Sequence, residues 1–143
     1  MLPLDLAKNT VVGILKAGCK AEEYLGITLK NSGISLQQFN VLRILRGRKG
    51  EPANLQTVQK RMIHKMSNTS RLVDKLIEKK FVTRKICKVN RRKIEIFLTD
   101  KGLDVLSQLD SKIQEIEATI LKPLNLEEQK KLRMLINKIT LNR

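Results

Sequence analysis

The 143-residue chain carries 29 Lys and Arg residues against 14 Asp and Glu residues, a formal net charge of +15. A hydrophobic content of 41% is enough for the core of one domain, and 3% aromatic residues without Trp predicts a core of Leu, Ile and Val that suits helix packing. The sequence has no apolar run of about 18 residues and no basic-then-apolar leader, so we expect no membrane span, no signal peptide and a cytoplasmic location.

The positive charge is concentrated in the middle of the chain. Residues 43–93 hold 17 Lys and Arg residues and three acidic residues, whereas the remainder holds 12 basic and 11 acidic residues. Because a solubilising surface would spread both signs over the chain, one concentrated basic region indicates a surface that binds a polyanion. The alternative is a solvated charged face or a basic surface of the ribosomal kind.

The N-terminal part of the chain predicts two helices. We expect one long helix over residues 4–31, weakened by internal glycines and followed by an Asn-Ser-Gly stop signal. Ser35 and Gln38 form a capping box that opens a second helix, which ends near Gly47.

Two further helices are predicted in the basic region. Asn54 can cap a short third helix, and Ser67 is the expected N-cap of a fourth. The fourth helix has residues of one buried stripe at helical spacing: Thr69, Leu72, Val73, Leu76 and Ile77. Its opposite face carries Asn68, Arg71 and Lys75, whose side chains can donate to phosphates and base edges.

A β-hairpin with a basic turn is predicted after the fourth helix. Its strands are expected at 81–87 and 93–98, and the first alternates poorly because Arg84 shares parity with Val82 and Ile86. Two short helices at this spacing, followed by a basic hairpin, predict a winged helix-turn-helix that binds DNA.

The C-terminal part predicts two helices with long apolar stripes. Thr99 and Asp100 cap a fifth helix, with apolar positions over 103–120 and an end at Pro123. The last helix opens at Asn125 or Leu126 and has apolar positions over 132–139.

These stripes and that of the first helix are longer than one small lobe can cover, so we expect an isologous homodimer. The alternative is that all three helices pack on their own protomer. We therefore expect residues 1–32 and 100–143 to form dimerisation helices around a DNA-binding lobe at 33–99.

The chain resembles the MarR (multiple antibiotic resistance regulator) family of bacterial transcription regulators. The resemblance runs from about Ser35 to Ile139, and it is carried by residues 36–42, 70–84 and 92–98 and by the Leu-Thr-Asp-Lys-Gly run at 98–102. It implies a mostly helical dimer with one winged helix-turn-helix per protomer. The fourth helix would enter the major groove, and the wing would approach the minor groove or its phosphates.

Two positions depart from the family pattern. Arg92 matches the arginine of the family's Asp-x-Arg wing motif, but Asn90 stands at the Asp position, so we expect a neutral amide contact to replace a carboxylate–guanidinium clamp. Lys80 stands where the family usually has Gly, so we expect the fourth helix to end with a C-cap other than the common Gly one.

The candidate DNA-binding residues lie at the start of the fourth helix and in the wing: Lys65, Ser67, Asn68, Ser70, Arg71, Lys75, Asn90, Arg91, Arg92 and Lys93. Arg71 and Asn68 can each read a base edge in bidentate fashion, and Lys75 is expected to meet phosphate. Lys65 and Ser67 precede the helix, where free backbone N–H groups also favour phosphate. Ser70 shares the exposed helix start, and the remaining four residues serve the wing.

No catalytic, cofactor or metal site is predicted. The single His64 lacks a Ser/Asp pattern, no phosphate-binding loop or dinucleotide fingerprint occurs, and Cys19 and Cys87 have neither zinc spacing nor a disulfide framework. We expect a DNA-binding regulator, a repressor released by a small ligand. The alternatives are an architectural or RNA-associated basic protein without an effector, and an adaptor that binds proteins through its terminal helices.

Overall fold

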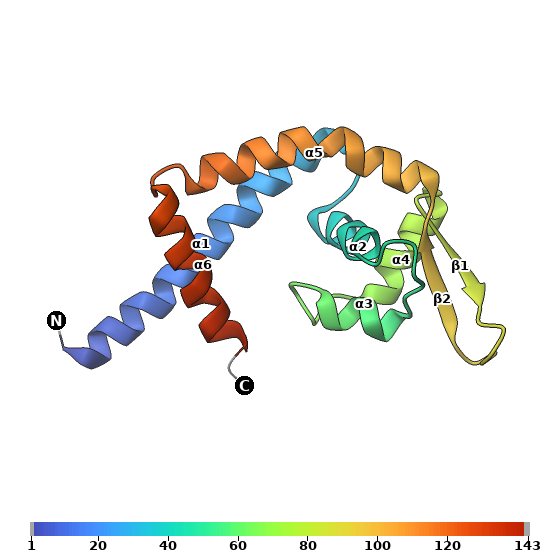
Figure 1. Cartoon of the computed structure of the whole chain (residues 1–143), viewed down its shortest axis with the longest axis horizontal. Coiled ribbons are helices and arrows are strands. Elements are labelled where there is room, and N and C mark those ends of the chain that lie inside the picture. The colour runs from blue at the N-terminus through green and yellow to red at the C-terminus, as the bar shows by residue number, and fades with distance from the viewer. Residues whose placement is uncertain (1, 142–143) are drawn as a thin grey trace. The chain divides into compact units, whose positions relative to one another are not determined.

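The computed structural model describes residues 2–141. In chain order it contains α1 (Pro3–Leu29), the 3-10 turn η1 (Lys30–Ser32), α2 (Leu36–Gly47), α3 (Leu55–Arg61), α4 (Thr69–Glu78), β1 (Val82–Ile86), β2 (Ile94–Leu98), α5 (Asp100–Leu121) and α6 (Leu126–Leu141) (Figure 1). This is the mostly helical fold with one β-hairpin that the sequence predicts. Two compact units divide the chain: Gly26–Ser111, and Met1–Leu25 with Lys112–Arg143. No helix within residues 2–141 is long and apolar enough to cross a membrane.

Side-chain caps begin the helices where the sequence places them. Ser35 Oγ accepts from the backbone N–H of Gln38 at 3.1 Å, and the Gln38 side chain accepts from the Ser35 N–H at 3.0 Å, which completes the capping box of α2. Asn54 caps α3. The first helix continues through its glycines but ends at Leu29, because the next residues tighten into η1 before Gly33 turns the chain at φ 77°.

The core of unit Gly26–Ser111 forms where α2 meets its neighbours. Helix α2 packs on α3, α4 and β2, while α4 packs on β1 and α3 on β2. The side chains that are almost fully excluded from solvent are aliphatic and come from every one of these elements and from α5: Val41, Leu42, Val58, Leu76, Val82, Ile96 and Leu106. Burial of this apolar surface is the main stabilising contribution, and it leaves the polar faces of α2 and α4 outside.

The hairpin is held to this core at its base. Strands β1 and β2 pair antiparallel from Val82↔Leu98 to Ile86↔Ile94, slightly shorter than predicted. Ile96 is also bridged to Ala53, through N–H···O=C bonds of 2.6 and 3.3 Å. Val82 and Ile96 are the buried residues of the two strands, so the far end of the hairpin lies outside the core.

The end of α4 corrects an expectation from the sequence. Lys80 itself adopts the left-handed conformation, at φ 64°, in place of a glycine. Its N–H donates to the Ile77 carbonyl at 2.9 Å, and the Phe81 N–H donates to the Leu76 carbonyl at 3.0 Å, which is the paired pattern of a Schellman motif. The usual helix end is therefore kept, and the lysine adopts a strained backbone conformation to keep it.

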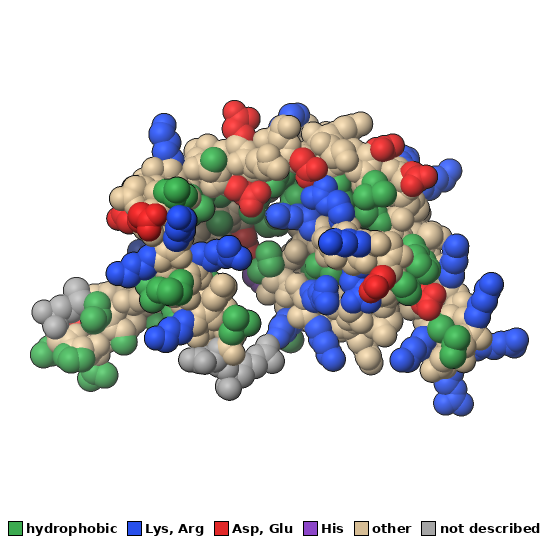
Figure 2. Space-filling model, viewed as in Figure 1, with side chains coloured by type: hydrophobic (Ala, Val, Ile, Leu, Met, Phe, Trp, Pro, Cys, Tyr) green, Lys and Arg blue, Asp and Glu red, His purple; other side chains and the backbone are tan. Residues whose placement is uncertain are grey.

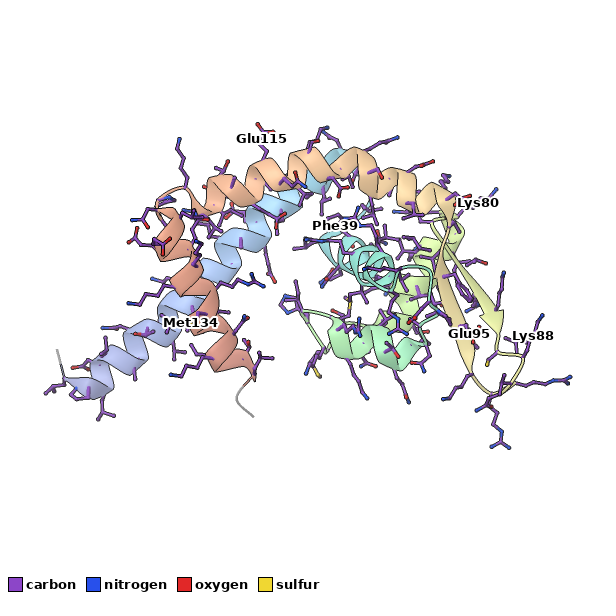
Figure 3. The ribbon with its side chains drawn as sticks, viewed as in Figure 1. Phe39, Lys80, Lys88, Glu95, Glu115 and Met134 are labelled. Atoms are coloured by element: carbon purple, nitrogen blue, oxygen red, sulfur yellow. The ribbon has the colours of Figure 1, made fainter. Side chains whose placement is uncertain are left out.

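The same segment is fixed to the start of α5. Thr99 Oγ1 donates to the Lys80 carbonyl at 2.7 Å and accepts from the Gly102 N–H at 3.1 Å, while the Thr99 N–H donates to the Phe81 carbonyl at 3.0 Å. Gly102 lies so close to this segment that an added Cβ would be 2.3 Å from the Phe81 carbonyl oxygen. The Leu-Thr-Asp-Lys-Gly run thus joins the end of α4, the hairpin and α5; Figure 3 labels Lys80 at this junction.

The other unit consists of α6 with the outer parts of α1 and α5. Helix α6 begins with a second capping box, in which Asn125 and Glu128 exchange side-chain-to-backbone hydrogen bonds of 2.9 and 3.0 Å. Helix α6 buries none of its described residues, and its apolar positions are exposed, as are those of the first half of α1. The predicted stripe of α5 differs, because Leu106, Leu109 and Ile113 are buried in the single chain. The apolar stripes that remain open to solvent are therefore those of α1 and α6.

Lys80→Gly should stabilise the protein by about 1 kcal/mol, because glycine adopts positive φ without the steric cost that an L-residue carries. Thermal or urea unfolding of the purified protein measures the change. Lys80→Ala is the matched control, since it removes the same charge and keeps the Cβ. Equal stability of the glycine and alanine variants would show that the backbone at Lys80 is not strained.

Gly102→Ala should destabilise the protein by about 1–3 kcal/mol, because the new methyl group would overlap the Phe81 carbonyl and force α5 away from it. Gly47→Ala is the control within a helix, where an added Cβ meets nothing within 4 Å. That control should be neutral or stabilise by up to about 1 kcal/mol. Similar denaturation midpoints for the two variants would contradict the close approach at Gly102.

Candidate nucleic-acid interface

Helix α4 separates a buried face from a polar face. Thr69, Val73 and Leu76 are buried, as the apolar stripe predicts, and Leu72 and Ile77 are half-buried beside them. The opposite face presents three predicted site residues, all of them exposed: Ser70, Arg71 and Lys75. The helix therefore presents donors to solvent while its apolar side fixes it to the core.

The helix begins one residue later than the sequence indicates. Asn68, not Ser67, is the N-cap, and its Oδ1 accepts from the Arg71 N–H at 3.1 Å. Both residue types cap helices well, but capping from Asn68 starts α4 at Thr69, which is buried. The Asn68 carbonyl oxygen is consequently engaged, and bidentate contact with a base would require the cap to open. Ser67 is half-buried in the preceding turn, next to the exposed Lys65.

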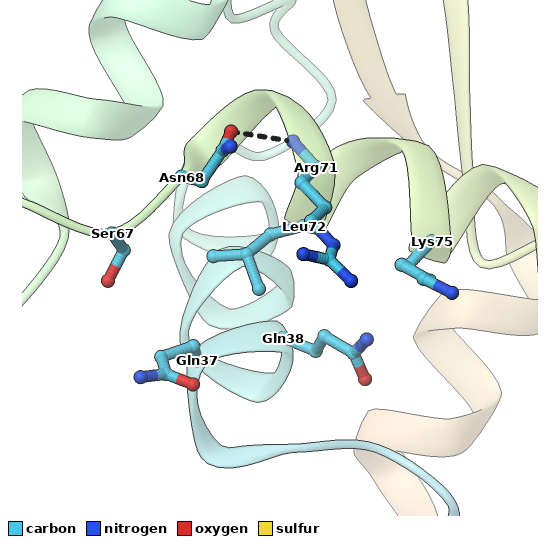
Figure 4. A pocket seen from close by; sticks show the side chains of 7 residues that line it. All are labelled: Gln37, Gln38, Ser67, Asn68, Arg71, Leu72 and Lys75. Atoms are coloured by element: carbon cyan, nitrogen blue, oxygen red, sulfur yellow. Dashed lines mark hydrogen bonds between the residues drawn. The ribbon is translucent and has the colours of Figure 1, made fainter.

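A hollow lies between the first turn of α2 and the polar face of α4. Its volume is about 280 Å³, and Figure 4 shows the residues that line it: Gln37, Gln38, Ser67, Asn68, Arg71, Leu72 and Lys75. Four of the predicted site residues are thereby brought together. Gln37 and Gln38 were not among the predicted site residues. The Ser35 capping box shows from the sequence that both lie in the first turn of α2, but no local signal shows that this turn meets α4.

Lys79 links the two helices at this hollow. Its Nζ donates to the Gly33 carbonyl and to Gln38 Oε1, the latter at 3.4 Å. Gln38 thus completes the cap of α2 and contacts the last turn of α4 through one side-chain oxygen. These contacts fix the direction of α4 relative to α2, which sets how the polar face of α4 is presented.

The wing tip is a cationic turn. Lys88, Arg91, Arg92 and Lys93 are all exposed, and Figure 2 shows Lys and Arg side chains gathered at the free end of the hairpin. Figure 3 labels Lys88 at that end. Among these residues, Lys88 was missing from the predicted site, although it lies in the same basic run. The tip therefore concentrates positive charge on a projecting turn, the form that suits contact with phosphates or a minor groove.

Asn90 orders the turn in a way that differs from the expectation. Its Oδ1 accepts from the backbone N–H of Arg92 at 3.1 Å, and its carbonyl accepts from the Lys93 N–H at 2.9 Å. The side-chain amide therefore fixes the backbone of the turn rather than the Arg92 guanidinium. This Asx-type contact needs only a side-chain oxygen, so asparagine serves in it as well as aspartate.

The two cysteines of the chain do not form a disulfide or a metal site in the described residues. Cys19 is exposed and Cys87 half-buried, both are free thiols, and no group of three metal-ligating side chains gathers within residues 2–141. The predicted site residues form two sets within a single compact unit, one on α4 and its preceding turn and the other on the wing. Asn68 and Asn90 belong to these sets, but their side-chain oxygens bind backbone N–H groups of the protein.

A short helix pair whose second member presents an exposed polar face, followed by a cationic hairpin, defines a winged helix-turn-helix protein. The model of the MarR family matches residues 34–94. The transcriptional regulator PecS of Dickeya dadantii is 30% identical over 140 residues, covering 95% of this chain and 83% of PecS. The chain belongs to the MarR family, and it is a DNA-binding transcription regulator.

Solved structures share the fold. A mutant of MarR from E. coli in complex with operator DNA has a TM-score of 0.84 at 21% identity, covering 97% of this chain and 99% of that one. BpsR of Bordetella bronchiseptica, whose DNA binding is regulated by 6-hydroxynicotinic acid, has a TM-score of 0.80 at 20% identity, covering 89% of each chain.

Proposed function

We propose that the protein is a repressor that binds a pseudo-palindromic operator as a homodimer and is released by a small molecule in the cytoplasm. The observation that carries this proposal is the presence of an exposed donor-rich face on α4 and a cationic wing in one compact unit. A major-groove helix and a minor-groove wing need these two features together.

The two surfaces have different roles in this proposal. Arg71 reaches a base edge in the major groove, with Ser70 beside it, while Lys75 and Lys65 meet phosphates. Arg91, Arg92 and Lys93 contact phosphates or the minor groove, and Asn90 shapes their turn. Ser67 and Asn68 direct the helix start toward the backbone of the duplex, where unpaired N–H groups favour phosphate.

The terminal helices provide the dimer interface in this proposal. Exposed apolar side chains recur along α1 and α6: Val11, Val12, Ile14, Leu15, Leu132, Leu135, Ile136 and Ile139. Many exposed apolar side chains on the same helices are typical of a protein–protein interface, and a second copy of the chain would supply a matching set by two-fold symmetry. Residues 1–32 and 100–143 would then dimerise, and residues 33–99 would bind DNA.

A small-molecule effector follows from the family context. DNA binding by BpsR is regulated by 6-hydroxynicotinic acid. A ligand shifts a regulator away from DNA only if it binds the released conformation more tightly than the bound one. We place no ligand in a particular cavity of this chain.

Selection of bound duplexes from random DNA tests this function. We expect an inverted repeat whose half-sites lie about one helical turn apart, because a two-fold dimer presents its two α4 helices symmetrically. A single unrepeated half-site would contradict the dimeric mode. Equal affinity for unrelated duplexes would instead identify an architectural protein. A log–log salt slope of about −0.9 per phosphate contact is expected in either case.

Arg71→Ala and Arg92→Ala should fail differently on variants of the selected operator. Loss of Arg71 should cost about 1–3 kcal/mol and relax preference at one base step in each half-site. Loss of Arg92 should weaken binding to most sequences, with the largest loss on A·T-rich flanks, where the narrow minor groove concentrates negative potential. Titrations on one panel of operators measure both effects, and identical sequence profiles for the two variants would refute this division of roles.

A further inference from the structure

Arg84 interrupts the apolar alternation of β1, and the structure explains why a charged residue stands there. It shares parity on β1 with the buried Val82, yet it is exposed. Its Nη1 lies 3.1 Å from Oδ1 of Asp74, on the polar side of α4. Both side chains are about half exposed, at 56% and 53%, so the pair adds little to stability. We therefore ask what the pair does for the position of the hairpin.

The ion pair attaches β1 at the same level at which β2 is attached. In the register of the hairpin, Arg84 lies opposite Ile96. Ile96 is the residue whose backbone is bonded to Ala53, at 2.6 and 3.3 Å. One strand is therefore held to α4 through a side chain, and the other is held to the segment before α3 through its backbone.

The hairpin is more exposed beyond that level, although Cys87 and Glu95 are half-buried and line a hollow with Pro52 and Asn54. The next pairs are Lys85↔Glu95 and Ile86↔Ile94, and Ile86 and Ile94 are 66% and 41% exposed. A two-stranded ribbon is marginally stable alone and twists readily. Its direction past the base is consequently set by the two attachments, and the cations of the tip are carried at the end of this ribbon.

The contact region between α4 and the hairpin is well filled. A cavity of about 20 Å³ remains there, enough for about one water molecule. Its apolar wall consists of Leu55, Val73, Ile94 and Ile96, and its polar side consists of Ser70, Asp74 and Arg84. The ion pair therefore continues the packed base of the hairpin toward solvent.

We propose that Asp74 and Arg84 are positioning residues that aim the wing, so that Arg92 contributes to DNA binding only while the pair is formed. Neither residue needs to touch DNA for this role. The inference rests on the proposed function, because it requires the wing to contact DNA.

The test measures the cost of Arg92→Ala in several backgrounds. Arg84→Gln and Asp74→Asn each break the pair, but they change the net charge in opposite directions. Simple charge effects on a polyanion would therefore shift operator affinity oppositely in the two variants. If the pair positions the wing, both variants should give the same result. The loss of operator affinity caused by Arg92→Ala should fall from about tenfold in the intact protein to about twofold or less.

Matched controls exist on the same two elements. Lys85→Gln makes the charge change of Arg84→Gln one residue along β1, and Glu78→Gln makes that of Asp74→Asn on α4. In both controls the cost of Arg92→Ala should stay near its original value. The exchanged pair, Asp74→Arg with Arg84→Asp, should restore it, which a change in fold stability alone would not do. Thermal unfolding of every variant confirms that folded proteins are compared.

The outcomes separate the two ideas. If Arg92→Ala costs the same with the pair broken as with it intact, the positioning role is wrong while the wing contact stands. If Arg92→Ala has no effect in the unaltered protein, the proposed wing contact is wrong, and the positioning role falls with it. If only one of the two pair-breaking variants reduces the Arg92 cost, a direct contact of that residue with DNA replaces positioning by the pair.

Discussion

The hydroxyl of Thr99 holds together the end of α4, the hairpin and the start of α5. It donates to the carbonyl of Lys80 and accepts from the N–H of Gly102, so the end of α4 and the start of α5 share one side chain. The hairpin begins and ends within this junction, since Phe81 also accepts from the Thr99 N–H. Because these bonds are short-range and directional, they fix where α4 stops and where the hairpin starts.

Beyond that junction, polar contacts at the edge of the apolar core orient α2, α4 and α5 relative to one another. Lys79 joins the last turn of α4 to the cap of α2, and the bidentate pair of Arg46 and Asp110, at 3.0 and 2.9 Å, joins α2 to α5. A charge-assisted fork restricts geometry more than a single contact does. The core supplies the stability of the unit, and these contacts specify the angles at which its helices meet.

Features set by residues close together in the sequence could be predicted, and features set by tertiary packing between distant segments could not. The capping box of α2 and the buried stripe of α4 follow from local spacing, and the structure has both. The choice of Asn68 over Ser67 as cap depends on which residue the core buries. The substitution at Lys80 indicated a new helix end, but the surrounding bonds impose the old one. The hollow beside Gln37 exists only once two helices meet, so no local pattern indicated it.

The uneven charge noted in the sequence has a consequence for the free protein. Residues 43–93 gather 17 cations and three anions into part of one small unit, so the folded state holds like charges closer together than the unfolded chain does. This internal repulsion opposes folding when counterions are scarce, and salt relieves it by screening. Salt should therefore stabilise the folded unit and weaken its binding to DNA. Phosphates of a bound duplex would relieve the same repulsion from outside, so DNA binding would add to the stability of the folded unit.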